Sequence, residues 1–146
     1  MMNWQKLLAD NRVTTEPSSR EELNSLSSIV ARSLKDVAAS ELSADTRFVL
    51  AYDAARTLSL MIVRAEGYRP RKTGGHYNTF LALEVADPAF TEVSAYFDSC
   101  RMMRNICEYD TAGGISETDA DSLLSRVKQF VKEVENWINA HHPELI

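Results

Sequence analysis

The segment that decides the fold is residues 43–67, SADTRFVLAYDAARTLSLMIVRAEG. Its apolar residues recur three, four and seven positions apart, which is the spacing of one face of an α-helix. Ser43-Ala44-Asp45 starts the segment, and Gly67 is the residue type that most often ends a helix. The apolar positions are Phe48, Ala51, Tyr52, Ala55, Leu58, Met61, Ile62 and Ala65. We therefore predict a long helix whose apolar side packs into a core, and whose alanines let a neighbouring helix approach closely.

A second long helix is predicted on the N-terminal side of this segment. Pro17-Ser18-Ser19 followed by Glu21 and Glu22 is a helix start, because Ser18 or Ser19 serves as the N-cap and acidic residues suit the first turn. Apolar residues at helical spacing follow until about residue 40, at Leu23, Leu26, Ile29, Val30, Leu34 and Val37. Residues 3–10 predict a short helix that covers the bundle, and the polar residues 11–17 connect the two.

The C-terminal side of the chain is predicted to be helical as well. We expect one helix over residues 76–85, and a second that Asp87-Pro88 opens and that runs over residues 88–109. Ser116 then caps a last helix, which ends at Pro143. Its apolar stripe is Leu123, Leu124, Val127, Phe130, Val131, Val134, Trp137 and Ile138.

Strand signals are nearly absent, because the sequence contains no Asn-Gly or Asp-Gly hairpin and no sustained alternation of β-branched and polar residues. The chain therefore predicts an all-α protein, an up-and-down bundle of four to five helices. We expect a single domain over residues 1–146, with residues 1–17 as the lead-in and residues 18–140 as the bundle.

The bulk composition is that of an ordinary globular protein, with 146 residues, 45% of them hydrophobic and 25% charged. The net charge of −5 argues against a wholly basic nucleic-acid binder but leaves room for a local basic face. No run of about 18 apolar residues exists, and the N-terminus lacks the apolar core of a signal peptide. We expect a cytoplasmic protein with no membrane association.

Neither the cysteines nor the histidines predict a metal site. Cys100 and Cys107 are seven residues apart, about 10 Å along a helix, which is too far for a disulfide. They are expected to be reduced thiols. The histidines are His76, His141 and His142, and the last two fall at the frayed end of the last helix. We expect no metal and no cofactor.

The densest cluster of chemically active side chains is residues 98–110, DSCRMMRNICEYD. On a helix, one face carries Asp98, Arg101, Arg104, Asn105, Glu108 and Tyr109. The opposite face carries Val93, Tyr96, Ser99, Cys100, Met102, Met103, Ile106 and Cys107, and is expected to pack into the core. Arginine forks bind phosphate or carboxylate oxygens with two hydrogen bonds. The alternative is that the charged residues are ordinary surface ion pairs, worth about 0.2–0.5 kcal/mol each.

A second cluster lies in residues 67–76, GYRPRKTGGH, and contains Arg69, Arg71, Lys72 and His76. In a chain of net negative charge these residues form a local positive patch, and glycine amides can approach a phosphate closely. The segment is no Walker loop, because the Gly-Lys-Ser/Thr ending and a preceding strand are missing. The alternative interpretation is a solvated surface loop.

Three segments together resemble the HEPN superfamily, and within it small bacterial stand-alone HEPN proteins. These segments are LSADTRFVLAYDAARTLSLMIVRAEGYRPRKTGGHYNTF, CRMMRNICEYD and ISETDADSLLSRVKQFVKEVENWI. The resemblance spans residues 42–138 and implies an up-and-down helical bundle that pairs as a homodimer. It also implies binding of RNA or a nucleotide. Many active members are metal-independent ribonucleases, and many of these are toxins whose antitoxin is a small nucleotidyltransferase.

The family motif is an Arg-Asn pair, a His five positions after the Arg, and often a Tyr two residues later. Here Arg104-Asn105 matches the pair, Tyr109 stands at the position of the His, and Thr111 stands at that of the Tyr. Cleavage of RNA through its 2′-hydroxyl needs a base, an acid and a cation for the phosphorane, and a His suits the first two roles. A Tyr can donate a proton or stack on a base, but it is a poor base at neutral pH. His76 would supply the missing imidazole if its loop folds over the face of residues 98–110 that carries Arg101 and Arg104.

The resemblance favours one functional hypothesis and leaves two others open. In the first, Arg101 and Arg104 hold an RNA or nucleotide phosphate, and Asn105 orients it. Tyr109 takes the place of the family's histidine. The basic loop, residues 67–76, widens the positive surface. In the second, the protein is a non-catalytic nucleotide-binding adaptor or the partner of a nucleotidyltransferase. In the third, the polar cluster only orders a homodimer.

Overall fold

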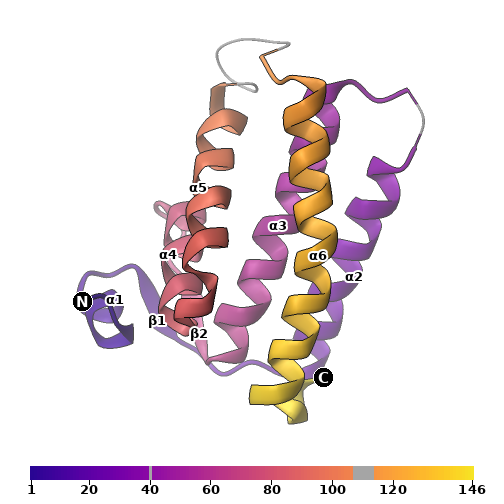
Figure 1. Cartoon of the computed structure of the whole chain (residues 1–146). Helices are drawn as coiled ribbons and strands as arrows, with labels where there is room; N and C mark the ends of the chain where they lie inside the picture. Colours follow the sequence, from indigo (N-terminus) through magenta and orange to yellow (C-terminus); the bar gives the residue numbers. More distant parts are fainter. Residues whose placement is uncertain (40, 107–113) are drawn as a thin grey trace.

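The computed structural model describes residues 1–39, 41–106 and 114–146 of the chain. The described elements are, in chain order, α1 (Trp4–Ala9), β1 (Val13–Thr15), α2 (Arg20–Val37), α3 (Ala44–Ala65), β2 (Tyr68–Pro70), α4 (Gly75–Ala86), the 3-10 turn η1 (Pro88–Phe90), α5 (Thr91–Asn105), α6 (Glu117–His141) and the 3-10 turn η3 (Pro143–Leu145). The long helices run side by side as an up-and-down bundle (Figure 1). The predicted all-α fold is confirmed.

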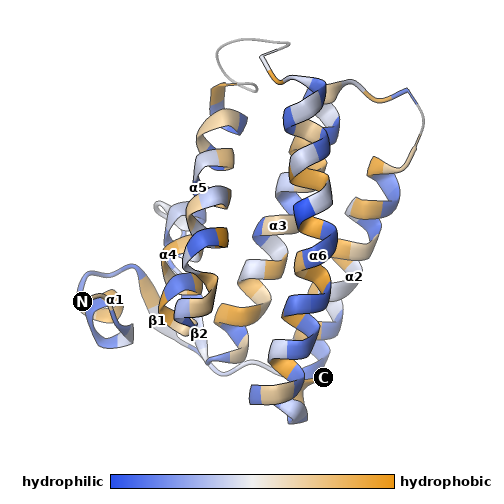
Figure 2. Cartoon of the chain, viewed as in Figure 1, coloured by the Kyte–Doolittle hydropathy of each residue, from blue (hydrophilic) through white to orange (hydrophobic). Residues whose placement is uncertain are grey.

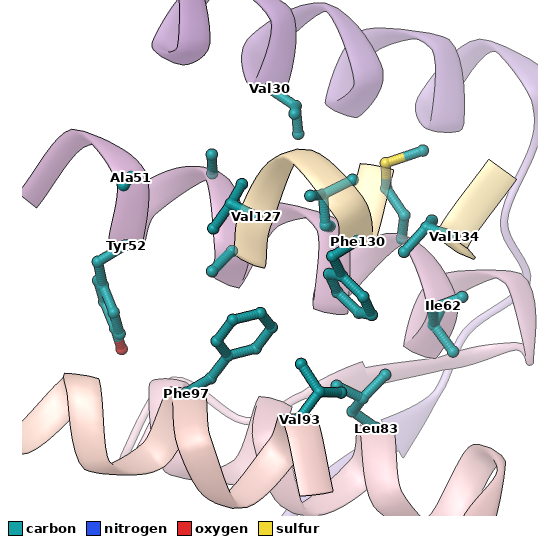
Figure 3. Close-up of a cluster of buried hydrophobic side chains, with 14 of the residues drawn as sticks. Val30, Ala51, Tyr52, Ile62, Leu83, Val93, Phe97, Val127, Phe130 and Val134 are labelled. Atoms are coloured by element: carbon teal, nitrogen blue, oxygen red, sulfur yellow. The ribbon is translucent and has the colours of Figure 1, made fainter. Parts of the chain in front are cut away.

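Helix α3 is the centre of the bundle, because it packs against α2, α4, α5 and α6. The predicted apolar stripe of α3 is buried, and the side chains of Phe48, Ala51 and Ala55 are fully enclosed. On the facing helices, the rings of Phe97 and Phe130 meet edge to face with their centroids 5.2 Å apart. Figure 3 shows these two rings among the aliphatic side chains of the core. Hydrophobic and hydrophilic residues alternate at helical spacing along α2 and α6, as Figure 2 shows.

The predicted helix starts are confirmed by their caps. The side chains of Ser19 and Ser43 accept hydrogen bonds from backbone amides of the first turns of α2 and α3. At α6, Ser116 and Asp119 form a reciprocal capping box. Gly67 has φ +91° just after the end of α3, a left-handed conformation that favours glycine. Local sequence signals therefore set both ends of α3.

A small sheet is the element that the sequence did not predict. Strands β1 and β2 pair antiparallel, with Val13 opposite Pro70 and Thr15 opposite Tyr68. Strands of three residues are too short to show alternation, so their pairing depends on tertiary packing. The pairing fixes the N-terminal segment beside the basic loop, where the amide of Arg71 donates to the carbonyl of Arg12 at 2.9 Å.

Helix α1 covers one side of the bundle, as predicted. Leu7 of α1 and Val13 of β1 are buried with Val63 and Ala82 in a second, smaller core. The ring of Trp4 stacks on that of Tyr68, with centroids 4.1 Å apart. The N-terminal segment is therefore an integral part of the fold.

Arg64, near the end of α3, ties the lead-in to the bundle. Its side chain is 2% exposed. Its guanidinium donates hydrogen bonds to the carboxylate of Glu22 and to the carbonyl oxygens of Glu16, Pro17 and Tyr68. Mainly through its hydrogen bond to the carboxylate, Arg64 lowers the pKa of Glu22 to about 2. All five guanidinium N–H groups thus have an acceptor.

The end of α5 departs from the expectation drawn from the helix wheel. Met102 and Ile106 were expected to face the core, yet their side chains are 52% and 51% exposed. Helix α5 packs mainly on α4 and α3, so a narrower side of it is covered than the wheel assumed. Cys100 is buried as a free thiol, and Cys107 lies outside the described residues. Within the described part of the chain, no helix is both long and apolar enough to cross a membrane.

Candidate functional site

The candidate site forms where α3, α4 and α5 meet. Tyr52 points from α3 toward α4 and α5 (Figure 3). Its hydroxyl lies 3.0 Å from Nδ1 of His76, in the first turn of α4. Arg104, on α5, places its Cζ 5.5 Å from the centroid of the Tyr52 ring. The basic loop, residues 67–76, therefore brings the imidazole of His76 beside α5, the helix that carries Arg104 and Asn105. The sequence had left open whether this loop folds over that helix.

Three arginines act on this imidazole. Arg56 lies one turn after Tyr52 on α3, while Arg101 and Arg104 lie on α5. Burial, and then the charges of Arg56, Arg104 and Arg101, lower the pKa of His76 to about 4. His76 is therefore neutral at pH 7.

The phenol of Tyr52 also stays in its neutral form. Burial raises its pKa above the ordinary value of a tyrosine, and the neighbouring arginines only partly offset this effect. A neutral phenol and a neutral imidazole share their hydrogen bond in two ways. When His76 donates from Nδ1, its Nε2 has a lone pair that can accept a proton; when the phenol donates, Nε2–H is a donor.

Arg101 makes one contact that the sequence allowed and one that it did not predict. Its Nε lies 2.7 Å from Oδ1 of Asp98, so this part of the cluster is the ordinary helix-surface pair. Its Cζ also lies 5.5 Å from the ring centroid of Tyr77, on α4. Arg101 thus connects α5 to α4, the helix that carries His76.

The two remaining motif residues lie at the end of the described part of α5. Asn105 is exposed and is the last residue of α5. Tyr109 lies outside the described residues, as do Glu108 and Thr111. Their predicted roles stay predictions.

The basic loop divides into parts with different surroundings. Arg69, on β2, is ion-paired with Glu16 at 2.5 Å and with Glu22 at 2.7 Å, so carboxylates balance its charge. Arg71 and Lys72 follow and are exposed, and they line an open hollow. His76 lies beyond them at the site. The structure therefore places Arg69 in an ion-pair cluster and Arg71 and Lys72 at the surface.

Sequence reasoning missed Tyr52 and Arg56 as site residues. Tyr52 was assigned to the core stripe, and it is indeed fully buried, but its hydroxyl reaches His76. Arg56 lies one turn after Tyr52 on α3, and its Nε is buried with no hydrogen-bond acceptor among the residues that the structure describes. A charged residue one helical turn from a buried Tyr was the available signal.

The described residues bring together no group of three or more His, Cys, Asp or Glu side chains that could hold a metal ion. The polar groups at the site are instead arginines, a phenol and an imidazole. Guanidinium groups attract anions, and a neutral imidazole has a nitrogen lone pair that can accept a proton. The arrangement is suited to holding a phosphate and moving a proton beside it.

Fold and site together define a class of protein. It is a helical bundle with a basic, histidine-containing face where α3, α4 and α5 meet. The family model for the SAV_6107-like HEPN domain matches residues 38–135, about two thirds of the chain. The chain belongs to the HEPN superfamily, in which the roles of members are often those of ribonucleases or are related to nucleotides. The comparisons with curated proteins and with solved structures find no match.

Proposed function

We propose that this HEPN protein binds a phosphate of RNA on the face formed by Tyr52, Arg56, His76 and Arg104, and that it cleaves the RNA without a metal ion. The observation that carries the proposal is the neutral His76 among three arginines. Like charges gathered around a half-buried base oppose its protonation, and an anion bound there relieves the repulsion. A phosphodiester is such an anion.

The binding step uses the arginines. Arg104 and Arg56 supply positive charge beside His76, and Arg101 adds a third charge next to Tyr77. Asn105, adjacent to Arg104, orients the bound phosphate through its amide. Arg69, Arg71 and Lys72 widen the positive surface, although Arg69 is balanced by Glu16 and Glu22.

The cleavage step uses His76 as a proton acceptor. Nε2 takes the proton of the 2′-hydroxyl, the 2′-oxygen bonds to phosphorus, and the bond from phosphorus to the 5′-oxygen breaks. The leaving 5′-oxygen takes up a proton, so the products are a 2′,3′-cyclic phosphate and a 5′-hydroxyl. Arginines stabilise the charge of the phosphorane. A pKa of about 4 makes free His76 a weak base, but bound phosphate raises that pKa by stabilising the imidazolium.

Tyr109 completes the proposal as the residue at the family's histidine position. A phenol with a pKa near 10 is protonated at neutral pH, so it can give a proton to the leaving 5′-oxygen. In this division of roles His76 is the base and Tyr109 the acid. Tyr109→Phe is therefore expected to slow cleavage while binding is retained.

A non-catalytic alternative is favoured by one observation. The low pKa of His76 and the Tyr at position 109 both reduce basicity at the site. In that case the same face binds a nucleotide phosphate without cleavage, and the protein acts as an adaptor or as the partner of a nucleotidyltransferase. A homodimer, as the resemblance implies, would bring two such faces into one assembly.

The test is cleavage of single-stranded RNA by the purified protein in EDTA. Wild type is compared with Arg104→Ala, His76→Ala and Tyr109→Phe, with His141→Ala as a matched control at the far end of the bundle. We expect cleavage to fall by about 10²–10⁴-fold in His76→Ala and Arg104→Ala, and to be unchanged in the control. Circular dichroism confirms that each variant is folded.

The outcomes separate the two functions. RNA that wild type binds but never cleaves supports the adaptor. Cleavage that survives in both His76→Ala and Arg104→Ala rejects this face as the catalytic site.

A further inference from the structure

A second basic surface lies beside the site, between the N-terminal segment and the basic loop. It is an open hollow of about 780 Å³. Its lining residues are Asp10, Asn11, Arg12, Arg71, Lys72, Thr73 and Asn78. Three cationic side chains thus face a single carboxylate in a chain whose net charge is negative. The hollow is chemically suited to an anion.

Asn78 holds the wall of this hollow in place. Its side chain is 2% exposed. Its Oδ1 accepts a hydrogen bond from Arg12 Nη1 at 3.2 Å, and its Nδ2 donates to the carbonyl of Thr73 at 3.0 Å. Because both arms of the amide are used, the N-terminal segment and the loop keep a fixed geometry. The cations are therefore preorganised for a ligand.

Tyr77 links the hollow to the candidate site. The Cζ of Arg12 lies 5.3 Å from its ring centroid, and the Cζ of Arg101 lies 5.5 Å from the same point. The guanidiniums of Arg12 and Arg101 therefore both lie against the ring of Tyr77. The ring contacts both cations, so Arg12 of the hollow and Arg101 of the candidate site share one aromatic neighbour, while Asp98 pairs with Arg101.

We propose that this hollow is a second phosphate subsite, so that the ligand of the protein is a single strand of nucleic acid and not a mononucleotide. The proposal rests on the proposed function, because the first phosphate of the strand lies beside His76. Arg71 and Lys72 hold a further phosphate of the same strand, with Arg12 behind them. Tyr77 is a positioning residue for Arg12 and Arg101.

The subsite includes Arg12, a residue that lies outside the part of the chain matched by the family model. Arg12 precedes the matched family region, which begins at residue 38. The pairing of β1 with β2 brings it there. Helix α4 begins next to the loop, and its N-cap Gly74 has no side chain to cap the first amides. The positive end of the helix adds to the attraction for an anion.

The experiment compares two ligands of different length. Fluorescence anisotropy measures binding of a labelled 2′-O-methyl uridine octamer, which cannot be cleaved through a 2′-hydroxyl, and calorimetry measures binding of uridine monophosphate. The double variant Arg71→Ala with Lys72→Ala removes two exposed cations of the hollow. Its control, Lys128→Ala with Lys132→Ala, removes the same charge from the exposed side of α6.

We expect the hollow variant to bind the octamer about tenfold more weakly at low salt and to bind the monophosphate as wild type does. Each phosphate that the variant no longer binds should reduce the slope of log affinity against log salt by about 0.7. Tyr77→Ala should weaken octamer binding and Tyr77→Phe should restore it, because the ring orders the arginines. Arg104→Ala should weaken binding of both ligands.

Three results overturn the proposal. They are unchanged octamer binding in the hollow variant, an equal loss in the α6 control, and wild-type protein that binds the octamer no more tightly than the monophosphate. If the hollow variant loses octamer affinity while Arg104→Ala loses none, the subsite stands and the proposed site beside His76 fails. Wild-type protein that binds neither ligand rejects both proposals.

Discussion

Two arginine clusters lie along α3, and they differ in what surrounds them. Around Arg64, carboxylates and carbonyl oxygens accept every guanidinium N–H. Around Arg56 lie a neutral imidazole and a neutral phenol, on which the charge of Arg104 also acts, and the carboxylate of Asp53 acts on the phenol. The first cluster lowers the pKa of an acid, Glu22, and the second lowers the pKa of a base, His76.

This difference distinguishes a structural cluster from a candidate binding cluster. A cluster whose charges are balanced stabilises the fold and has little left for a ligand. A cluster that opposes protonation of its own histidine gains free energy when an anion arrives. Perturbed pKa values mark both kinds of site, so the sign of the charge around the perturbed group is what separates them.

The largest expected effect is on folding stability. Arg64→Met should lower the free energy of unfolding by about 3 kcal/mol or more, because it leaves three carbonyl oxygens without the Arg64 donor and removes one of the two arginines paired with Glu22. Arg56→Met on the same helix is the matched control and should change stability by less than about 1 kcal/mol. Urea unfolding followed by circular dichroism measures both. Equal losses in the two variants would show that the Arg56 cluster is structural too.

The next effect is on the pH dependence of stability. The folded pKa of His76 lies below its unfolded value of 6.5, so its contribution is present above pH 6.5 and is lost as the pH falls toward 4. The folded pKa of Glu22 lies below 4.5, so its contribution is lost as the pH falls from 4.5 toward 2. The Glu22 step should be on the order of 2 kcal/mol, reduced by the 26% exposure of the carboxyl.

Two variants assign these steps. His76→Phe should remove the loss between pH 6.5 and 4, and Glu22→Gln should remove the loss below pH 4.5. Urea unfolding across this range measures the free energy of unfolding. A single step that neither variant alters would contradict both assignments.

The fold was predictable from local signals, and the reason is visible in particular residues. Ser19, Ser43 and Ser116 cap the helices that their positions predicted, and the stripe of α3 is buried as its spacing indicated. These features depend on residues within one or two helical turns. The β1–β2 pairing has no such local cause, since it joins residues about 55 positions apart.

The site was only partly predictable. Arg104 and Arg101 follow from the helix wheel and from the family motif, and His76 was named as a candidate base. Tyr52 and Arg56 belong to α3, and only the packing of three helices brings them beside His76. Arg12 was not predicted, because its position depends on the unpredicted sheet. Contacts between distant segments are what one sequence leaves undetermined.

The smallest expected effect is also the most direct test of the comparison. Removing one positive charge near His76 favours its protonation, so Arg56→Met should raise the pKa of His76 by about 0.5–1 unit. Arg64→Met, eight residues further along α3, should leave that pKa unchanged because carboxylates balance the charge of Arg64. NMR titration of the imidazole protons measures both variants, after unfolding curves confirm that they are folded. Addition of the uncleavable octamer to wild type should shift the same pKa upward, since a bound phosphate stabilises the imidazolium. A His76 that titrates near 6.5 in free wild type would remove the electrostatic difference between the two clusters and with it the main support for a phosphate site on this face.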